Sequence, residues 1–212
     1  MGFRISLNAD EIAARLASVN ASANDPPFPE FPILSKFLQG EPKPAAVLIP
    51  LLRNGNEWHI LFTRRNANLP EHSGQVAFPG GRADPNDDNL EATALRETWE
   101  EIGIHPSDVN VLGRLPRFLT ITNYLVTPIV GQIPWPYPLQ PATDEVSRIF
   151  TISLDWLADP LNHEERLRAL PEPFAPISVI YFKEYDGEIL WGASARFTLI
   201  FLNILSGNHS HS

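Results

Sequence analysis

The amino-acid sequence predicts an α/β fold in which a mixed β-sheet lies between helices. Two observations lead to this fold class. Short segments rich in Val, Ile, Leu and aromatic residues follow one another along the chain, with turn residues between them. One helical pattern stands in the middle of this series and another at its end, which favours a sheet covered by helices.

The first 42 residues predict a helix followed by a Pro-rich linker. Ile12, Leu16 and Val19 recur at helical spacing, and the segment from residue 20 to residue 32 is rich in Pro, Asn and Ser. The chain is therefore expected to have three parts: residues 1–42 (N-terminal helix and linker), residues 43–207 (the main domain) and residues 208–212 (a disordered tail).

Within the main domain, segments rich in β-branched and aromatic residues predict strands, and two amphipathic segments predict helices. The turn sequences Asn54-Gly55-Asn56 and Asp186-Gly187 each separate two strand-like segments and predict hairpins. The predicted strands are residues 45–52, 58–62, 75–78, 109–115, 125–133, 148–152, 178–182 and 189–191, and the predicted helices are residues 90–102 and 193–205.

Length and composition are those of one globular domain with a core of its own: 212 residues, of which 43% are hydrophobic and 19% charged. The net charge of −9 argues against broad nucleic-acid binding, and no segment approaches the roughly 18 apolar residues needed to cross a membrane. The sequence contains no cysteine, so carboxylates and His remain as metal-binding side chains. No secretory signal pattern occurs in residues 1–30, and a cytoplasmic location is expected.

The helix over residues 90–102 is predicted to have an acidic face. At about 100° per residue, Glu97, Glu100 and Glu101 fall within roughly 100° of one another. These like charges repel, and the last two would lie at the negative end of the helix dipole. A divalent cation such as Mg²⁺ would turn this repulsion into attraction. The alternative is a solvated acidic helix face. The opposite, apolar face would consist of Leu95, Trp99 and Ile102.

The ends of this helix are marked by capping residues. Asp88 is predicted as the N-cap, with Glu91 completing a capping box, and Gly103 as the stop. Upstream, Gly80 and Gly81 would let the backbone approach a ligand or metal without a Cβ in the way. A plain turn is the other explanation for this Gly pair.

The nine residues 96–104, Arg-Glu-Thr-Trp-Glu-Glu-Ile-Gly-Ile, resemble the second half of the signature of the Nudix hydrolase family. That half runs Arg-Glu-apolar-any-Glu-Glu-any-Gly-apolar, and only Thr98 departs from it. The first half differs more, because Asp88 stands where Glu is usual and six residues rather than five separate it from Gly81. The resemblance spans roughly residues 44–205 and implies a Nudix-type α/β/α sandwich that hydrolyses pyrophosphate bonds.

The residues before this signature (the Nudix box) resemble those of the coenzyme A pyrophosphatase branch of the family. The resembling residues are Leu61 to Arg65, Leu69, Gly74 and Phe78 to Gly81. Phe62, Asn66 and Pro70 depart from that branch, and Pro70 replaces an Arg that would face a polyphosphate. The implied substrate is coenzyme A or an acyl-coenzyme A, giving phosphopantetheine and adenosine 3′,5′-bisphosphate. The alternatives are ADP-ribose or another nucleoside diphosphate derivative, and a Nudix-fold binding module without turnover.

The resemblance also implies roles for individual residues. Glu97 and Glu101 would bind Mg²⁺ or Mn²⁺, with Glu100 joining a second ion or tuning the first. Arg96 would hold the glutamates in position; a surface ion pair is the simpler alternative. The base that activates water would be Glu145 or its neighbour Asp144, although an acidic loop explains that pair equally well.

Phosphate contacts are expected from the cations and the glycines near the box. Arginine offers a bidentate fork to phosphate, although ordinary surface charge is the alternative for each one. His72 is a second candidate base.

The expected partner is a small nucleotide, with no nucleic acid and no membrane, and a homodimer is left open. The candidate substrate contacts are Arg64, Arg65, Arg82, Gly80 and Gly81.

Overall fold

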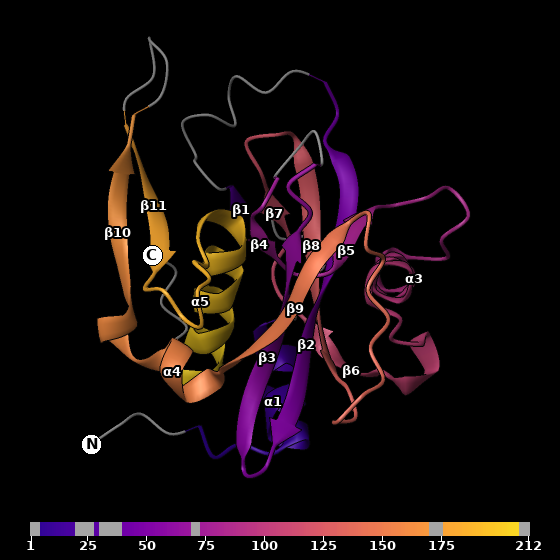
Figure 1. Ribbon diagram of the computed structural model, residues 1–212, viewed down its shortest axis with the longest axis horizontal. Coiled ribbons are helices and arrows are strands. Elements are labelled where there is room, and N and C mark those ends of the chain that lie inside the picture. Colours follow the sequence, from indigo (N-terminus) through magenta and orange to yellow (C-terminus); the bar gives the residue numbers. More distant parts are fainter. Residues whose placement is uncertain (1–4, 20–27, 30–39, 69–72, 170–175, 208–212) are drawn as a thin grey trace.

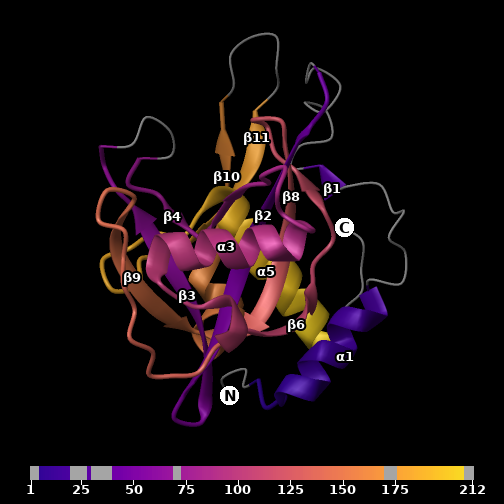
Figure 2. The same cartoon turned by 90° about the vertical axis from the view of Figure 1, so that its right-hand side faces the viewer.

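The computed structural model describes residues 5–19, 28–29, 40–68, 73–169 and 176–207, and it has the predicted three layers. A mixed β-sheet runs through the centre, with α3 (Leu90–Ile102) on one face and α5 (Gly192–Ser206) on the other (Figure 1). Figure 2 shows α3 in front of the sheet, α5 behind it and α1 (Ala9–Val19) along one side. The predicted α/β fold with a mixed sheet between helices is confirmed. None of the described helices is long and apolar enough to span a membrane.

The sheet is built around β2 (Lys43–Asn54). This strand runs parallel to β8 (Tyr124–Gln132) and antiparallel to β3 (Glu57–Arg65). Both faces of β2 are covered, so its sequence is a nearly continuous apolar run rather than an alternating one. The other strands of this sheet are β1 (Phe28–Pro29), β4 (Val76–Ala77), β5 (Gly80–Arg82), β6 (Asn110–Arg114), β7 (Phe118–Leu119) and β9 (Val146–Ser153).

A separate two-stranded sheet stands beside α5. It consists of β10 (His163–Arg168) and β11 (Ile177–Phe182), paired antiparallel. One face of β11 places Ile180 and Phe182 in the main core. A short helix, α4 (Leu154–Ala158), and the 3₁₀ turn Pro160–Asn162 connect β9 to this sheet.

The feature that positions the candidate site is a change of partner along β2. Ala45 to Val47 pair with β5, whereas Leu51 to Asn54 pair with β3. Between these two stretches, Leu48 donates its backbone N–H to the Pro79 carbonyl at 2.9 Å. The segment that leads into the Gly pair therefore enters the sheet where β3 and β5 diverge, with α3 packed directly over it.

The N-terminal helix packs on the rest of the molecule. Ile12 and Leu16 of α1 are fully buried and belong to the same core cluster as α5 and β6 residues. Gly113 of β6 makes room for this contact, because a Cβ there would press against the Leu16 side chain at 2.9 Å. The helical face predicted from Ile12 and Leu16 is thus the face that is buried.

Several predicted elements are confirmed within a few residues, and others need correction. The central helix spans the predicted residues and ends at Gly103, which has the left-handed backbone of a C-cap. Its N-cap is Asn89 rather than Asp88, since the Asn89 side chain accepts the Ala92 N–H at 2.9 Å. The prediction that Trp99 packs on an apolar face is wrong: its side chain is 52% exposed.

The face of α3 that is buried against the sheet is instead Thr93, Ala94, Thr98, Glu101 and Ile102. Thr98 tolerates burial because its hydroxyl donates to the Ala94 carbonyl at 2.6 Å. The acidic face and the buried face therefore overlap at Glu101, which the helical wheel had placed on the side away from the core.

The late hairpin is only partly as predicted. The turn at Asp186 and Gly187 forms, with positive φ at both residues. Its second arm is reduced to isolated bridges, such as the one between Tyr181 and Trp191. The main partner of β11 is β10, which the sequence did not predict as a strand. The predicted tail at residues 208–212 lies outside the described residues.

Candidate active site

The C-terminal half of α3 lies against β5 and brings two glutamates to the Gly pair. The Glu101 side chain is 6% exposed and the Glu97 side chain 20% exposed. The fit is tight at Gly81, because a Cβ at this position would overlap the Glu97 carboxylate. A side chain at residue 81 would therefore displace the Glu97 carboxylate from its present position.

Glu101 is an acid buried beside two stabilising groups. Its carboxylate accepts a hydrogen bond from the Gly80 backbone N–H and lies 3.8 Å from the Arg65 guanidinium. These contacts do not offset desolvation: burial, together with the nearby Glu145 and Glu97 charges, raises the pKa of Glu101 to about 8. Burial likewise raises the pKa of Glu97. The nearby arginines therefore do not fully stabilise the ionised form of either carboxylate.

Arg96 is the centre of the ion-pair network on the outer side of these glutamates. Its guanidinium lies 2.9 Å from Glu97 and 3.0 Å from Glu100. It also forms a two-point contact with Asp87, at 2.8 and 3.0 Å. The hydrogen bonds from Arg96 hold the pKa of Asp87 well below its usual value. Arg96 therefore holds the segment before α3 in place through Asp87 and also fixes the orientation of Glu97.

The loop that carries Glu145 is attached to the end of α3. The backbone N–H of Gln140 donates to the Ile102 carbonyl and that of Ala142 to the Glu101 carbonyl, both at 2.9 Å. These bonds satisfy carbonyl groups that a helix end leaves free. They also place Glu145 close enough for its charge to raise the pKa of both Glu97 and Glu101.

The two neighbouring arginines at the end of β3 have different partners. The register with β9 shifts between Arg64 and Arg65. Arg64 pairs with the buried Glu188 at 3.4 Å, together with Arg148. Arg65 turns to Glu101 instead and lines the adjacent pocket. The structure therefore brings Arg65 to the acidic cluster and pairs Arg64 with Glu188 instead.

A pocket of about 650 Å³ opens beside the acidic cluster. Gly80, Gly81 and Arg65 belong both to this pocket wall and to the surroundings of the glutamates. Among the described residues, the lining contains three arginines, Arg65, Arg82 and Arg168, and no Asp or Glu. In a chain with a net charge of −9, such a lining favours an anionic ligand.

Most of the predicted site residues are brought together. Glu97, Glu100, Glu101, Arg96 and Glu145 gather around the end of α3, and Arg65, Arg82, Gly80 and Gly81 line the pocket. Arg64 does not line it, and His72 lies outside the described residues. Sequence reasoning missed Asp87, Arg168 and Trp191. Asp87 could have been found from its position just before the helix, whereas Arg168 and Trp191 lie in segments that contain no motif.

The donor set suits a hard divalent cation. The available groups are carboxylates and backbone carbonyls, and Mg²⁺ sites in proteins commonly use one or two carboxylates together with substrate phosphate. Among the described residues, no three Asp, Glu or His side chains meet closely enough to hold an ion unaided. Glu97 and Glu101 fit such a carboxylate site, because Glu101 is buried and Glu97 partly buried, and a cation would stabilise the ionised form of both.

The free energy of unfolding of the metal-free protein is expected to fall as the pH rises from about 4.5 to about 8. Glu101 binds its proton more tightly in the folded state than in the unfolded state, so the unfolded state is favoured as the proton leaves. The expected loss is a few kcal/mol at most, since one pKa unit corresponds to about 1.4 kcal/mol.

Urea unfolding of wild type and Glu101→Gln at pH 5, 6.5 and 8, with chelator present, measures this effect. The Gln variant should lose less stability than wild type over the same interval. Asp87 does not interfere, because its lowered pKa affects stability only below this interval. Equal slopes for the two proteins would contradict a raised pKa at Glu101.

Known proteins resemble this chain in sequence and in fold. Residues 42–174 match the NUDIX domain family. The chain is 37% identical over 173 residues to a protein of Yersinia pestis named Nudix hydrolase NudL, covering 76% of this chain and 79% of that protein. The structure resembles a MutT protein from Methanosarcina mazei (20% identity, TM-score 0.50, 82% and 99% of the two chains). It also resembles a MutT/nudix family protein from Enterococcus faecalis (16% identity, TM-score 0.50, 99% and 78%). The family match and the NudL relative together show that the chain belongs to the Nudix hydrolase family.

Proposed function

We propose that this Nudix hydrolase cleaves the pyrophosphate bond of coenzyme A or an acyl-coenzyme A. Family membership supports pyrophosphohydrolase activity on nucleoside diphosphate derivatives. The observation that carries the proposal is the pocket lined by three arginines and, among the described residues, no Asp or Glu, which lies beside the buried Glu101 and the partly buried Glu97. Its volume is in the range of pockets that take nucleotide-sized ligands. The motif before the Nudix box favours the coenzyme A branch among such substrates.

Nudix hydrolases generally use divalent metal ions. We assign Glu97 and Glu101 as the ligands, with Glu100 next to them and exposed enough to join a second ion. A bound Mg²⁺ or Mn²⁺ would neutralise phosphate charge and lower the pKa of a coordinated water. Arg96 holds Glu97 and Glu100 in place through its direct contacts with both carboxylates.

The remaining roles follow from position. Glu145 is exposed and within electrostatic reach of Glu97 and Glu101, so it can accept a proton from water attacking near them. Arg65 and Arg82 line the end of the pocket that is next to the acidic cluster, and they can form charge-assisted hydrogen bonds to the diphosphate. Arg64 is already paired with a buried carboxylate, and we assign it no substrate contact.

The rival substrate class is ADP-ribose or another nucleoside diphosphate derivative without a phosphate on its ribose. The observation that favours this rival is Pro70, which stands where the coenzyme A branch has a cation. The two classes share the metal chemistry and differ in the distal half of the substrate.

The ratio of kcat/KM for coenzyme A to that for dephospho-coenzyme A distinguishes the two classes. We expect a preference for coenzyme A of roughly tenfold, which corresponds to about 1.4 kcal/mol, because its extra 3′-phosphate meets an arginine-lined pocket. The assay uses one fixed salt concentration and either Mg²⁺ or Mn²⁺, and products are identified by mass.

Two outcomes would change the assignment. A ratio at or below one would show that the 3′-phosphate is not recognised. Turnover of ADP-ribose without turnover of coenzyme A would favour the rival class. The Glu97→Gln variant, prepared in parallel, shows whether any weak turnover comes from this site or from a contaminating enzyme.

A further inference from the structure

The pocket has a second wall, opposite the one formed by the Gly pair. This wall comes from the β10–β11 sheet and the start of α5, with Arg168, Ile177, Val179 and Trp191 among its residues. In Figure 1, β10 and β11 lie on one side of α5, whereas β4 and β5 lie on the other. A ligand held by Gly80, Gly81 and Arg82 would therefore extend toward a distinct set of side chains.

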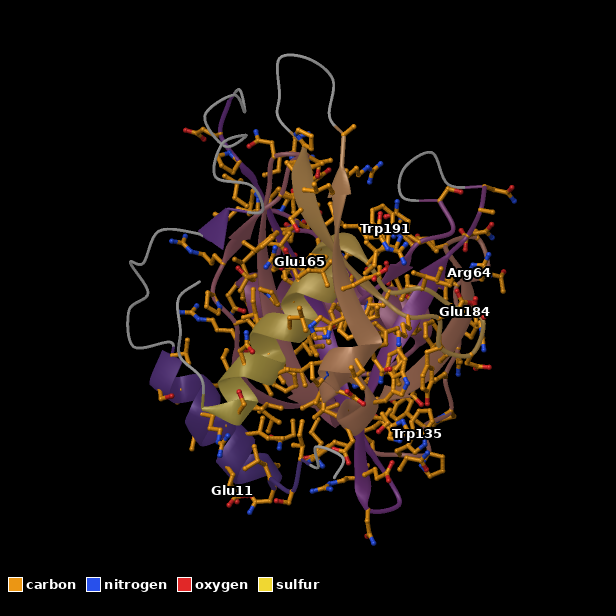
Figure 3. The ribbon with its side chains drawn as sticks, turned by 90° about the vertical axis from the view of Figure 1, so that its left-hand side faces the viewer. Glu11, Arg64, Trp135, Glu165, Glu184 and Trp191 are labelled. Atoms are coloured by element: carbon orange, nitrogen blue, oxygen red, sulfur yellow. The ribbon has the colours of Figure 1, made fainter. Side chains whose placement is uncertain are left out.

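Trp191 gives this wall a fixed aromatic surface. Its ring stacks on that of Tyr181 with the ring centres 5.5 Å apart and an angle of 4° between the planes. A β-bridge between the same two residues holds the backbone in register. The side chain remains partly exposed to the pocket at the point where α5 begins (Figure 3). A rigid indole in this position can stack with a planar ligand at low entropic cost.

Arg168 gives the same wall a cation that has no carboxylate partner among the described residues. Its guanidinium lies 5.4 Å from the centre of the Trp191 ring, and among the described residues it pairs with no carboxylate. Arg166, two residues earlier on the same face of β10, provides a contrast. It lies over Tyr181, is paired with Glu164 at 2.6 Å and is not among the residues that line the pocket.

We propose that Trp191 and Arg168 form a nucleoside subsite, in which Trp191 stacks on the base and Arg168 binds a phosphate carried by the ribose. Aromatic surfaces accept any base because every base has a π face, and an adjacent arginine adds selectivity for phosphate. The inference rests on the proposed function, since it assumes that the diphosphate lies at the end of the pocket near Arg65 and Arg82. It assigns the distal half of the substrate to residues outside the Nudix box.

Binding of two adenosine phosphates tests the subsite without requiring turnover. The probes are adenosine 5′-phosphate and adenosine 3′,5′-bisphosphate, titrated calorimetrically into the protein with Mg²⁺ present. Neither contains a pyrophosphate bond, so both remain intact whatever the hydrolytic activity. Wild type should bind the bisphosphate about tenfold more tightly than the monophosphate.

The two substitutions should have different signatures. Trp191→Ala should weaken both probes by about tenfold, because stacking on the base is common to them. Arg168→Gln should weaken only the bisphosphate, by about tenfold, and so remove the preference. Arg166→Gln and Trp99→Ala are the matched controls and should bind both probes as wild type does. Circular dichroism checks that each variant is folded, and the exposed Arg168 can be replaced without opening the core.

Each other outcome overturns the inference. Unchanged affinity in Trp191→Ala removes the stacking role, and a retained preference in Arg168→Gln removes the phosphate role. Equal losses in Arg166→Gln and Arg168→Gln would indicate a general effect of surface charge. Failure of the proposed function is seen separately, as absent hydrolysis of coenzyme A, dephospho-coenzyme A and ADP-ribose.

Discussion

Replacing Glu101 with Gln is expected to lower kcat/KM by about 100-fold or more. The variant keeps the shape of the side chain and can still accept the Gly80 N–H, but it removes the negative charge that a divalent cation requires. Glu97→Gln should behave in the same way, because Glu97 lies against Gly81 on the same side of the helix. The measurement is steady-state kinetics at saturating Mg²⁺ with whichever of coenzyme A, dephospho-coenzyme A and ADP-ribose the wild type hydrolyses best.

The same variant separates catalytic loss from structural damage. Glu101 is buried and costly to ionise, so the Gln variant should be at least as stable as wild type at pH 8 in the absence of metal. Glu91→Gln is the matched control, since it changes an exposed glutamate in the first turn of α3 and should leave the rate unaltered. A Glu101→Gln rate within a factor of about three of wild type would withdraw the ligand assignment.

The sequence predicted an element of the fold well where the residues that indicate it all lie within one segment. The helix over residues 90–102 has an apolar periodicity, a Gly stop and cap-forming residues before it, all within one segment. The N-cap was misplaced by one residue because Asp88 and Asn89 are both good caps, and only the hydrogen bond to Ala92 decides between them. Strand β10 was missed because it is an exposed edge strand, with charged residues in place of an apolar alternation.

Trp99 shows the limit of a helical wheel. The wheel gives the angle between residues, but it does not say which side of the helix meets the sheet. In the structure the sheet meets the side that includes Thr98 and Glu101, and Trp99 is left in edge contact with His105. A large apolar side chain was therefore the wrong guide to the buried face, because the helix has to bring a carboxylate into the site.

The candidate site was predictable where its residues are close in sequence. Glu97, Glu100, Glu101 and Arg96 come from one helix, so their mutual positions follow from helical geometry. Glu145 reaches the same place only through hydrogen bonds between its loop and the end of α3. Arg64 and Arg65 have different partners because successive side chains of a strand lie on opposite faces of the sheet, but the sequence does not say which face meets the acidic cluster.

Removal of divalent metal is expected to abolish hydrolysis, and addition of Mg²⁺ or Mn²⁺ should restore it. Without a cation, the glutamates offer the substrate diphosphate no charge neutralisation, and no coordinated water has a lowered pKa. The assay measures turnover with excess chelator, followed by titration of each metal back into the same sample. Undiminished turnover in excess chelator would contradict the metal mechanism.

Metal binding itself should depend on pH in a way that identifies the ligand. A cation competes with the proton on Glu101, whose pKa is raised to about 8 by burial, so metal affinity should increase as the pH rises toward 8. The readout is the increase in melting temperature caused by Mg²⁺ at pH 6, 7 and 8, with no substrate present. In Glu101→Gln this increase should be small and nearly independent of pH, whereas Glu91→Gln should follow wild type. A pH dependence that survives in Glu101→Gln would mean that the proton displaced by the metal comes from another group.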